Sequence, residues 1–241
     1  MHIAESTWTD VADADTSLAL LPVGSTEQHG PHAPLGTDVL TAEAVADAGA
    51  ERYADAHDEP VLVAPPVPVG VAEEHRSFAG TLWVPEDSFR AYVGDVLRSL
   101  AASADRVVVV NGHGGNVAAL RETCARVTRD GDAYAVPFTW FDVASGMGHG
   151  GPVETALVRH VAPDLVREDR VEAAAEGAAD GWGEWVAGVN LAYDSDEFTD
   201  NGVVGDPREG DAARGERLLA EAGSALVELL ERVRDRELPD R

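Results

Sequence analysis

Three polar loops hold the side chains of this sequence that could carry out chemistry. The first runs from Gly24 to Asp38 and brings Glu27, His29 and Asp38 close together. A mixed set of carboxylates and imidazole suits Zn²⁺, Mn²⁺ or Fe²⁺ better than Ca²⁺, which prefers an all-oxygen cage. An ordinary polar loop of helix caps and turn residues is the alternative. Taken alone, this loop leaves the two interpretations evenly matched.

The second loop, residues 111–116, places one histidine, His113, among three glycines. Glycine costs backbone entropy unless the local geometry needs it, so this pattern indicates a close approach between backbone and ligand. A phosphate cradle at a helix N-terminus is one interpretation, but the segment matches neither a dinucleotide fingerprint nor a P-loop. We therefore favour His113 held at a strand end, with the glycines admitting metal or substrate.

The third loop, residues 146–155, combines His149 with Glu154, which lies at a predicted helix start. A carboxylate in the first turn of a helix stays ionised, as a metal ligand must. The plainer interpretations are a solvent-exposed loop histidine and simple charge complementarity with the helix. A fourth patch, residues 70–81, contributes Glu74 and His75. We expect these two to line the pocket without a catalytic role, a surface pair being the alternative.

The intervening segments predict the elements that would bring these loops together. Apolar runs predict strands at residues 18–23, 60–64, 106–110 and 133–138, which alternate with predicted helices at 39–55, 86–104, 117–128, 153–160 and 212–236. This alternation is typical of an α/β fold with a mostly parallel sheet flanked by helices. In such sheets ligands bind at the carboxyl ends of the strands, where the polar loops begin. We expect residues 1–241 to form a single domain.

Charge and composition exclude several classes of partner. The chain has 44 acidic residues against 18 basic ones, all of them Arg, and a net charge of −26. Such a surface repels nucleic acid and anionic membranes, and no apolar run approaches the roughly 20 residues of a membrane span. The N-terminus does not resemble a secretory signal and Cys124 is the single cysteine, so we expect a cytoplasmic protein. The acidic shell predicts adaptation to high salt, with a merely solubilising surface as the alternative.

Taken together, the motifs resemble the creatininase (creatinine amidohydrolase) family. The resemblance lies in VGSTEQHGPH at residues 23–32 with Asp38, NGHGGN at residues 111–116 and HGGPVET at residues 149–155. The patch with Glu74 and His75 fits the same family, and the similarity extends from about residue 18 to residue 166. Membership implies a parallel sheet flanked by helices, two divalent metal ions (Zn, Mn or Fe) and a homo-oligomer, often a hexamer.

The resemblance also implies a set of metal ligands. Glu27 and His113 would hold one metal, and His29 would hold the other. Asp38 would bridge both metals. Creatinine-hydrolysing members have Tyr and Glu after the motif histidine, and that Glu is a ligand, whereas this chain has Gly114 and Gly115. Glu154 is the candidate substitute for the missing ligand.

The substrate implied by the resemblance is an amide other than creatinine. The loop before His149 is shorter than in creatininase and lacks a tryptophan that packs on creatinine, although Trp140 could supply another pocket aromatic. We predict a two-metal hydrolase of amide-type C–N bonds that acts on a small-molecule amide. The archaeal formamide hydrolase of riboflavin and deazaflavin-cofactor synthesis is favoured by the acidic, lysine-free composition. The alternatives are a peptidase of the mycofactocin-precursor type and a catalytically silent small-molecule-binding α/β protein.

His149 is the candidate catalytic residue. In the implied mechanism the metals activate water for attack on the amide carbonyl, and the leaving nitrogen must then accept a proton. His149 is the imidazole left once the ligands are assigned, so we expect it to transfer that proton. The alternative role for His149 is to orient the substrate.

Overall fold

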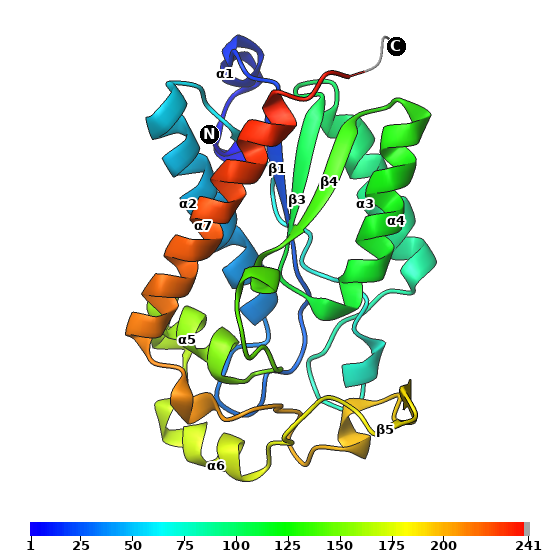
Figure 1. The fold of residues 1–241 in the computed structure, drawn as a ribbon, viewed down its shortest axis with the longest axis vertical. Coiled ribbons are helices and arrows are strands. Elements are labelled where there is room, and N and C mark those ends of the chain that lie inside the picture. Colours follow the sequence, from blue (N-terminus) through cyan, green and yellow to red (C-terminus); the bar gives the residue numbers. More distant parts are fainter. Residues whose placement is uncertain (239–241) are drawn as a thin grey trace.

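A four-stranded parallel sheet forms the centre of the computed structural model, which describes residues 1–238 (Figure 1). The strands are β1 (Leu18–Val23), β2 (Leu62–Val63), β3 (Arg106–Asn111) and β4 (Tyr134–Thr139). Their order across the sheet is β2-β1-β3-β4. The two central strands, β1 and β3, are parallel and pair over their full length. Their carboxyl ends therefore reach the same edge of the sheet side by side.

Side chains of the central strands alternate between the two faces of the sheet, as the strand period requires. In β1, Leu18 and Leu20 pack into one core, whereas Ala19 and Leu21 pack into the other. Both cores consist of apolar side chains removed from water, which is the main favourable contribution to folding. Burial on both faces explains why the strand reads as an uninterrupted apolar run rather than an alternating one.

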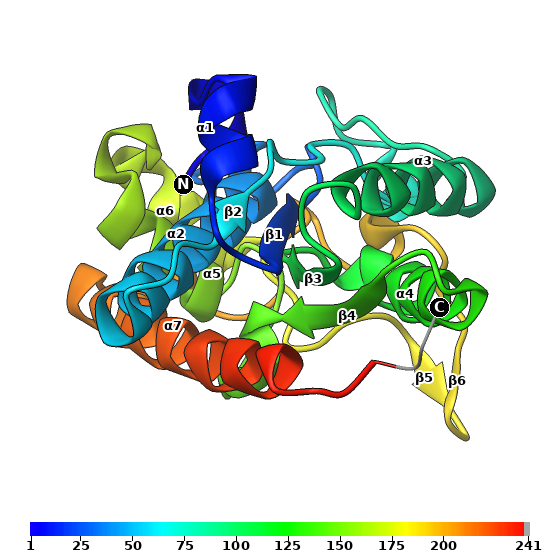
Figure 2. The same ribbon diagram turned by 90° about the horizontal axis from the view of Figure 1, so that it is seen from above.

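Helices cover both faces of the sheet (Figure 2). The first face is covered by α2 (Thr37–His57), α5 (Pro152–Val161) and α7 (Ala212–Arg234), and the second by α3 (Glu86–Leu100) and α4 (Val117–Asp130). This arrangement confirms the predicted α/β class. Both cores share one sheet, and the last three residues of the predicted domain, 239–241, lie outside the described residues.

The main differences from the expected elements lie at their ends. β2 is two residues long, Leu62–Val63, because Pro65, Pro66 and Pro68 follow it and cannot donate to a sheet. α3 ends at Leu100, four residues before the expected boundary. A short N-terminal helix, α1 (Trp8–Asp13), was not expected from the sequence; Thr7 caps it, its side chain accepting from the backbone N–H of Asp10.

The acidic, glycine-rich stretch between α5 and α7 is ordered and runs past the carboxyl edge of the sheet (Figure 1). It contains helix α6 (Val171–Glu176) and a small antiparallel pair, β5 (Trp185–Val186) and β6 (Val189–Asn190). Among residues 1–238, none of the helices combines the length and the apolar character needed to cross a membrane.

Candidate metal centre and substrate pocket

The loops that follow β1 and β3 meet at one edge of the sheet. β1 ends at Val23 and β3 at Asn111, and these two residues are register partners. The first loop therefore delivers Glu27 to the same place as the second loop delivers His113. Oε1 of Glu27 and Nδ1 of His113 lie 3.1 Å apart.

Asp38 enters this site from the first turn of α2, which begins at Thr37. The helix dipole favours a carboxylate at that position. Gly112 lets the β3 loop pass against this turn, because a Cβ there would collide with the carbonyl oxygen of Asp38. As a result, Oδ2 of Asp38 lies 3.2 Å from Nδ1 of His113, and its Oδ1 lies 3.0 Å from Nε2 of His29.

Three carboxylate oxygens at this edge are buried without a hydrogen-bond donor among the described residues. Both carboxylate oxygens of Glu27 and Oδ2 of Asp38 have no hydrogen-bond partner among the described residues, although these residues are 0% and 1% exposed. A buried charge left unpaired is costly, and a bound cation would offset that cost. Three overlapping sets of side chains have ligand atoms within 4.8 Å of one another: Glu27–Asp38–His113, His29–Asp38–Glu154 and Glu27–His29–His149.

Three of the site histidines are each fixed by a main-chain carbonyl. Nδ1 of His29 lies 3.1 Å from the oxygen of Glu27, Nε2 of His113 lies 2.7 Å from that of Val71, and Nε2 of His149 lies 2.6 Å from that of Gln28. A carbonyl oxygen can only accept, so these nitrogens carry protons and donate. The opposite nitrogen of each ring faces carboxylates. Metal-binding histidines are held in this way, so the residues present fit a metal centre.

The pKa values at the site show a strongly negative potential. Burial lowers the pKa of His29, but Asp38 and Glu154 outweigh burial and raise that pKa well above its usual value. Burial also lowers the pKa of His113, and Glu27 and Asp38 raise it well above the usual value. Burial raises the pKa of Asp38, whereas His29 and His113 bring it well below its ordinary range. The carboxylates therefore favour positive charge here, as they would for a divalent cation.

The third loop adds Glu154 and His149 to the same cluster. Glu154 lies in the first turn of α5, and its Oε2 accepts from the backbone N–H of Gly150 at 2.6 Å. Its Oε1 lies 3.8 Å from Nε2 of His29. Nδ1 of His149 lies 3.8 Å from Oε1 of Glu27. Because His149 is 6% exposed, the interpretation as a solvent-exposed loop histidine is wrong.

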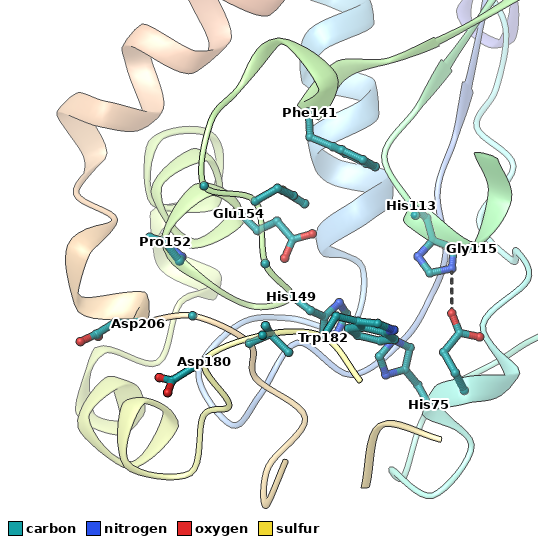
Figure 3. Close-up of a pocket in the computed structure, with 18 of the residues that line it drawn as sticks. His75, His113, Gly115, Phe141, His149, Pro152, Glu154, Asp180, Trp182 and Asp206 are labelled. Atoms are coloured by element: carbon teal, nitrogen blue, oxygen red, sulfur yellow. Dashed lines mark ion pairs between the residues drawn. The ribbon is translucent and has the colours of Figure 1, made fainter. Parts of the chain in front are cut away.

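A cavity of about 710 Å³ lies over the cluster (Figure 3). His113, His149 and Glu154 line it, together with Glu74 and His75 from the fourth patch. The apolar part of its lining comes from separate segments and comprises Phe141, Met147, Pro152, Trp182 and Val204. The cluster is thus accessible to a ligand much larger than a metal ion.

The expectation that Trp140 lines the pocket is wrong. Trp140 is fully buried and packs in the core formed with α2, α5 and α7. The chain turns into a short 3₁₀ segment directly after β4, and this turn directs Trp140 inward. Its neighbour Phe141 lines the cavity instead, with the two rings edge to face at 5.8 Å.

Sequence reasoning missed two residues of this site, Trp182 and Gln28. The ring of Trp182 meets His75 and His149 edge-on, at 5.6 Å and 5.9 Å between centroids. The side chain of Gln28 lies between His75 and the long stretch before α7, where it donates to the carbonyl oxygen of Gly202 at 3.0 Å. A tryptophan in an otherwise acidic, glycine-rich stretch was the available signal for Trp182, and the position of Gln28 between Glu27 and His29 was the signal for Gln28.

Comparison with known proteins places this arrangement in a family. The sequence model of creatininase, creatinine amidohydrolase, matches residues 4–230. The chain belongs to the creatininase family. The predicted family and the predicted class, a metal-dependent amidohydrolase, are therefore confirmed.

Relatives and solved structures agree with this assignment. The mycofactocin precursor peptide peptidase of Mycobacterium ulcerans is 38% identical over 220 residues, covering 90% of this chain and 82% of the relative. The creatinine amidohydrolase of Pseudomonas putida is 31% identical over 203 residues, covering 71% and 75%. Among solved structures, a manganese form of creatininase has a TM-score of 0.78 at 25% identity and covers 98% of this chain and 99% of its own. Another creatininase structure, at 24% identity, shares the fold with a TM-score of 0.81 and covers 98% of each chain.

Proposed function

We propose that this creatininase-family protein is a metal-dependent peptidase that cleaves an amide bond in a peptide precursor. It would then resemble in function the mycofactocin precursor peptide peptidases to which its sequence is similar. The observation that carries the proposal is the identity of 36–38% to such peptidases over 83–90% of this chain. The creatinine amidohydrolase is less similar and matches less of the chain. Our preferred function is thus the alternative considered from the sequence, rather than the archaeal formamide hydrolase.

Two divalent cations fit the arrangement of side chains. Glu27 and His113 would hold one, His29 and Glu154 the other, and Asp38 faces both sets with one oxygen each. Glu154 replaces the ligand that Gly115 cannot provide. Cations held there supply Lewis acidity, which activates both water and an amide carbonyl. Zinc, manganese and iron all accept such a ligand set.

His149 is placed to move a proton. Its Nε2 donates to the carbonyl oxygen of Gln28, so Nδ1 presents a lone pair toward Glu27. Burial lowers the pKa of His149, and the neighbouring His29 lowers it further, which keeps the ring neutral and able to accept. Nδ1 takes a proton from the attacking water and delivers it to the leaving nitrogen, which would otherwise depart as a poorly stabilised anion.

The size of the cavity favours a peptide over a small ring. A volume of about 710 Å³ lies in the range of pockets that enclose drug-sized ligands. Gly114 adds room, because nothing lies within 4 Å of where its Cβ would stand. Several residues of a peptide therefore fit beside the metal ligands.

The charge of the cavity disfavours a phosphorylated substrate. Five carboxylates line it, and the lining contains no arginine: Glu74, Glu154, Asp180, Asp206 and Glu209. Phosphate recognition relies on Arg, Lys or backbone N–H groups. A nucleotide-like formamide would thus meet repulsion here, whereas an uncharged or cationic peptide would not.

Mass spectrometry of metal-loaded protein tests the proposal. We expect Mn²⁺- or Zn²⁺-loaded enzyme to shorten a precursor-type peptide, to leave creatinine intact, and to leave a phosphorylated nucleoside formamide intact. The Asp38→Asn variant is the inactive control, and Asp13→Asn, which removes an exposed carboxylate at the end of α1, is the matched active control. Hydrolysis of the formamide but not of peptides would overturn the proposal. Metal binding without hydrolysis of any amide would instead support the catalytically silent binding protein. Cytoplasmic location and homo-oligomeric assembly stay predictions.

A further inference from the structure

The orientation of the Gln28 side-chain amide is fixed by two main-chain groups. The backbone N–H of Gly30 can only donate, and it meets Oε1 of Gln28 at 2.8 Å. The carbonyl oxygen of Gly202 can only accept, and it meets Nε2 of Gln28 at 3.0 Å. Gly202 is held in a left-handed conformation (φ 81°) against this side chain, and a Cβ there would collide with the amide. Gln28 therefore presents its remaining Nε2–H in one direction.

That remaining N–H determines which nitrogen of His75 carries the proton. Nδ1 of His75 lies 2.9 Å from Nε2 of Gln28, so Nδ1 accepts and has a lone pair. The hydroxyl of Ser195, 3.0 Å from the same nitrogen, donates its own proton to the carbonyl oxygen of Glu74, so the amide of Gln28 is the donor to Nδ1. The proton of a neutral His75 therefore sits on Nε2. His149 has the opposite character, because its Nε2 donates to the carbonyl oxygen of Gln28 and its Nδ1 turns a lone pair toward the site.

The Nε2–H group of His75 faces the site without a hydrogen-bond partner among the described residues. The nearest carboxylate oxygen to this N–H group is Oε1 of Glu27, which lies 3.4 Å away, beyond the usual N–H···O distance. That oxygen has no hydrogen-bond partner of its own among the described residues. His75 is 1% exposed yet lines the cavity, with its ring stacked on that of His149 at 4.3 Å (Figure 3). Because His75 lines the cavity, an acceptor atom of a bound ligand can complete this donor.

We infer that His75 donates a hydrogen bond from Nε2–H to the carbonyl oxygen of the bound amide, and holds that oxygen as charge develops on it. The inference rests on the proposed function, since it requires an amide in this pocket. Preorganised donors aimed at a developing oxyanion contribute strongly to acyl-transfer catalysis. His75 is placed for the task because its ring stacks on that of His149 at the wall of the cavity. Gln28 acts through His75 as a positioning residue.

Two variants of His75 test this role. His75→Phe keeps a ring in the stack with His149 but removes the donor, and His75→Gln restores an N–H donor without a ring. We expect His75→Phe to lower kcat about 10²–10³-fold with metal content unchanged, and His75→Gln to recover part of the loss. His160→Phe, which replaces an exposed histidine of α5, is the matched control and should retain wild-type kcat.

Nitrogen NMR of the imidazoles provides a readout that does not depend on turnover. We expect His75 of the metal-loaded enzyme to carry its proton on Nε2 and to leave Nδ1 unprotonated. A proton on Nδ1 would overturn the inference whether or not the enzyme cleaves peptides. In an active wild-type enzyme, an unchanged kcat in His75→Phe would overturn it as well. Loss of metal from His75→Phe would also overturn it, because His75 would then act on Glu27 rather than on the substrate.

Discussion

Nε2 of His149 lies 2.6 Å from the carbonyl oxygen of Gln28, and this contact leaves Nδ1 of the same ring facing Glu27. We therefore expect His149→Ala to reduce turnover about 10²–10⁴-fold because the proton acceptor is lost. Metal content, measured by plasma mass spectrometry, should stay at the wild-type level. Because His149 is also within ligand distance of Glu27 and His29, a loss of one metal ion would make it a ligand instead.

Asp38 is predicted to be required for both metal sites. Its two carboxylate oxygens face different histidines, Oδ1 toward His29 and Oδ2 toward His113. Asp38→Asn should therefore lose both metals together, and Asp13→Asn should lose neither. Metal content after gel filtration is the measurement. Retention of one full equivalent of metal by Asp38→Asn would show that the carboxylate does not bridge.

Gly115 and Gly114 offer a matched pair of substitutions. A Cβ at Gly115 would collide with the carbonyl oxygen of Val71 and lie 2.5 Å from Nε2 of His113, whereas a Cβ at Gly114 meets nothing within 4 Å. Gly115→Ala should disturb the anchor of His113 and weaken metal binding about 10–100-fold. Gly114→Ala should bind metal as the wild type does, as titration with a chelator would show. Equal affinities in the two variants would argue against the anchor.

The burial of His32 should make the folded protein less stable in acid. Its Nε2 donates to Oγ1 of Thr155 at 2.9 Å, since that hydroxyl donates to Gly150, and its Nδ1 is buried without a partner among the described residues. Burial, with smaller contributions from His29 and Arg159, lowers the pKa of His32 from 6.5 to about 4. The unfolded chain then binds more protons than the folded one between those values, so stability is full above pH 6.5 and falls as pH drops toward 4, by up to ~3 kcal/mol. His32→Asn should flatten this slope in denaturant unfolding at constant salt. The exposed His160→Asn should not.

The net charge of −26 predicts that stability depends on salt. Repulsion among the carboxylates is screened over about 3 Å at 1 M salt but over about 30 Å at 0.01 M. The melting temperature should therefore fall on dialysis from molar to millimolar KCl. The same melting temperature at both concentrations would exclude adaptation to high salt.

The placement of the ligands could be predicted from the sequence because it depends on local patterns. The alternation of apolar runs with helices predicted parallel strands, which β1 and β3 are, so the loops carrying Glu27 and His113 were expected at one edge. Asp38 was predicted from its place in the polar loop that begins at Gly24, and its bridging role from the resemblance to the creatininase family. Trp140 and Phe141 show the limit of such reasoning, since a single turn after β4 decides which ring faces the cavity.

Contacts between distant segments could not be predicted from the sequence. Gln28 and Gly202 are 174 residues apart, and their hydrogen bond depends on how the stretch before α7 folds back over the site. The position of Trp182 against His75 has the same origin. The proton on each imidazole depends on partners of this kind, so the sequence indicated which histidines belong to the site but not which nitrogen each would present.

The oxygen atoms that orient His29, His113 and His149 belong to the main chain, at Glu27, Val71 and Gln28. Replacing the Val71 side chain leaves its main-chain carbonyl in position. A substitution at residue 71 therefore keeps the hydrogen bond that orients His113. Phe141, Met147 and Trp182, by contrast, line the cavity and supply none of these carbonyl oxygens. Redesign of substrate preference can therefore begin with Phe141 and Met147, whereas Trp182 also packs against His75 and His149.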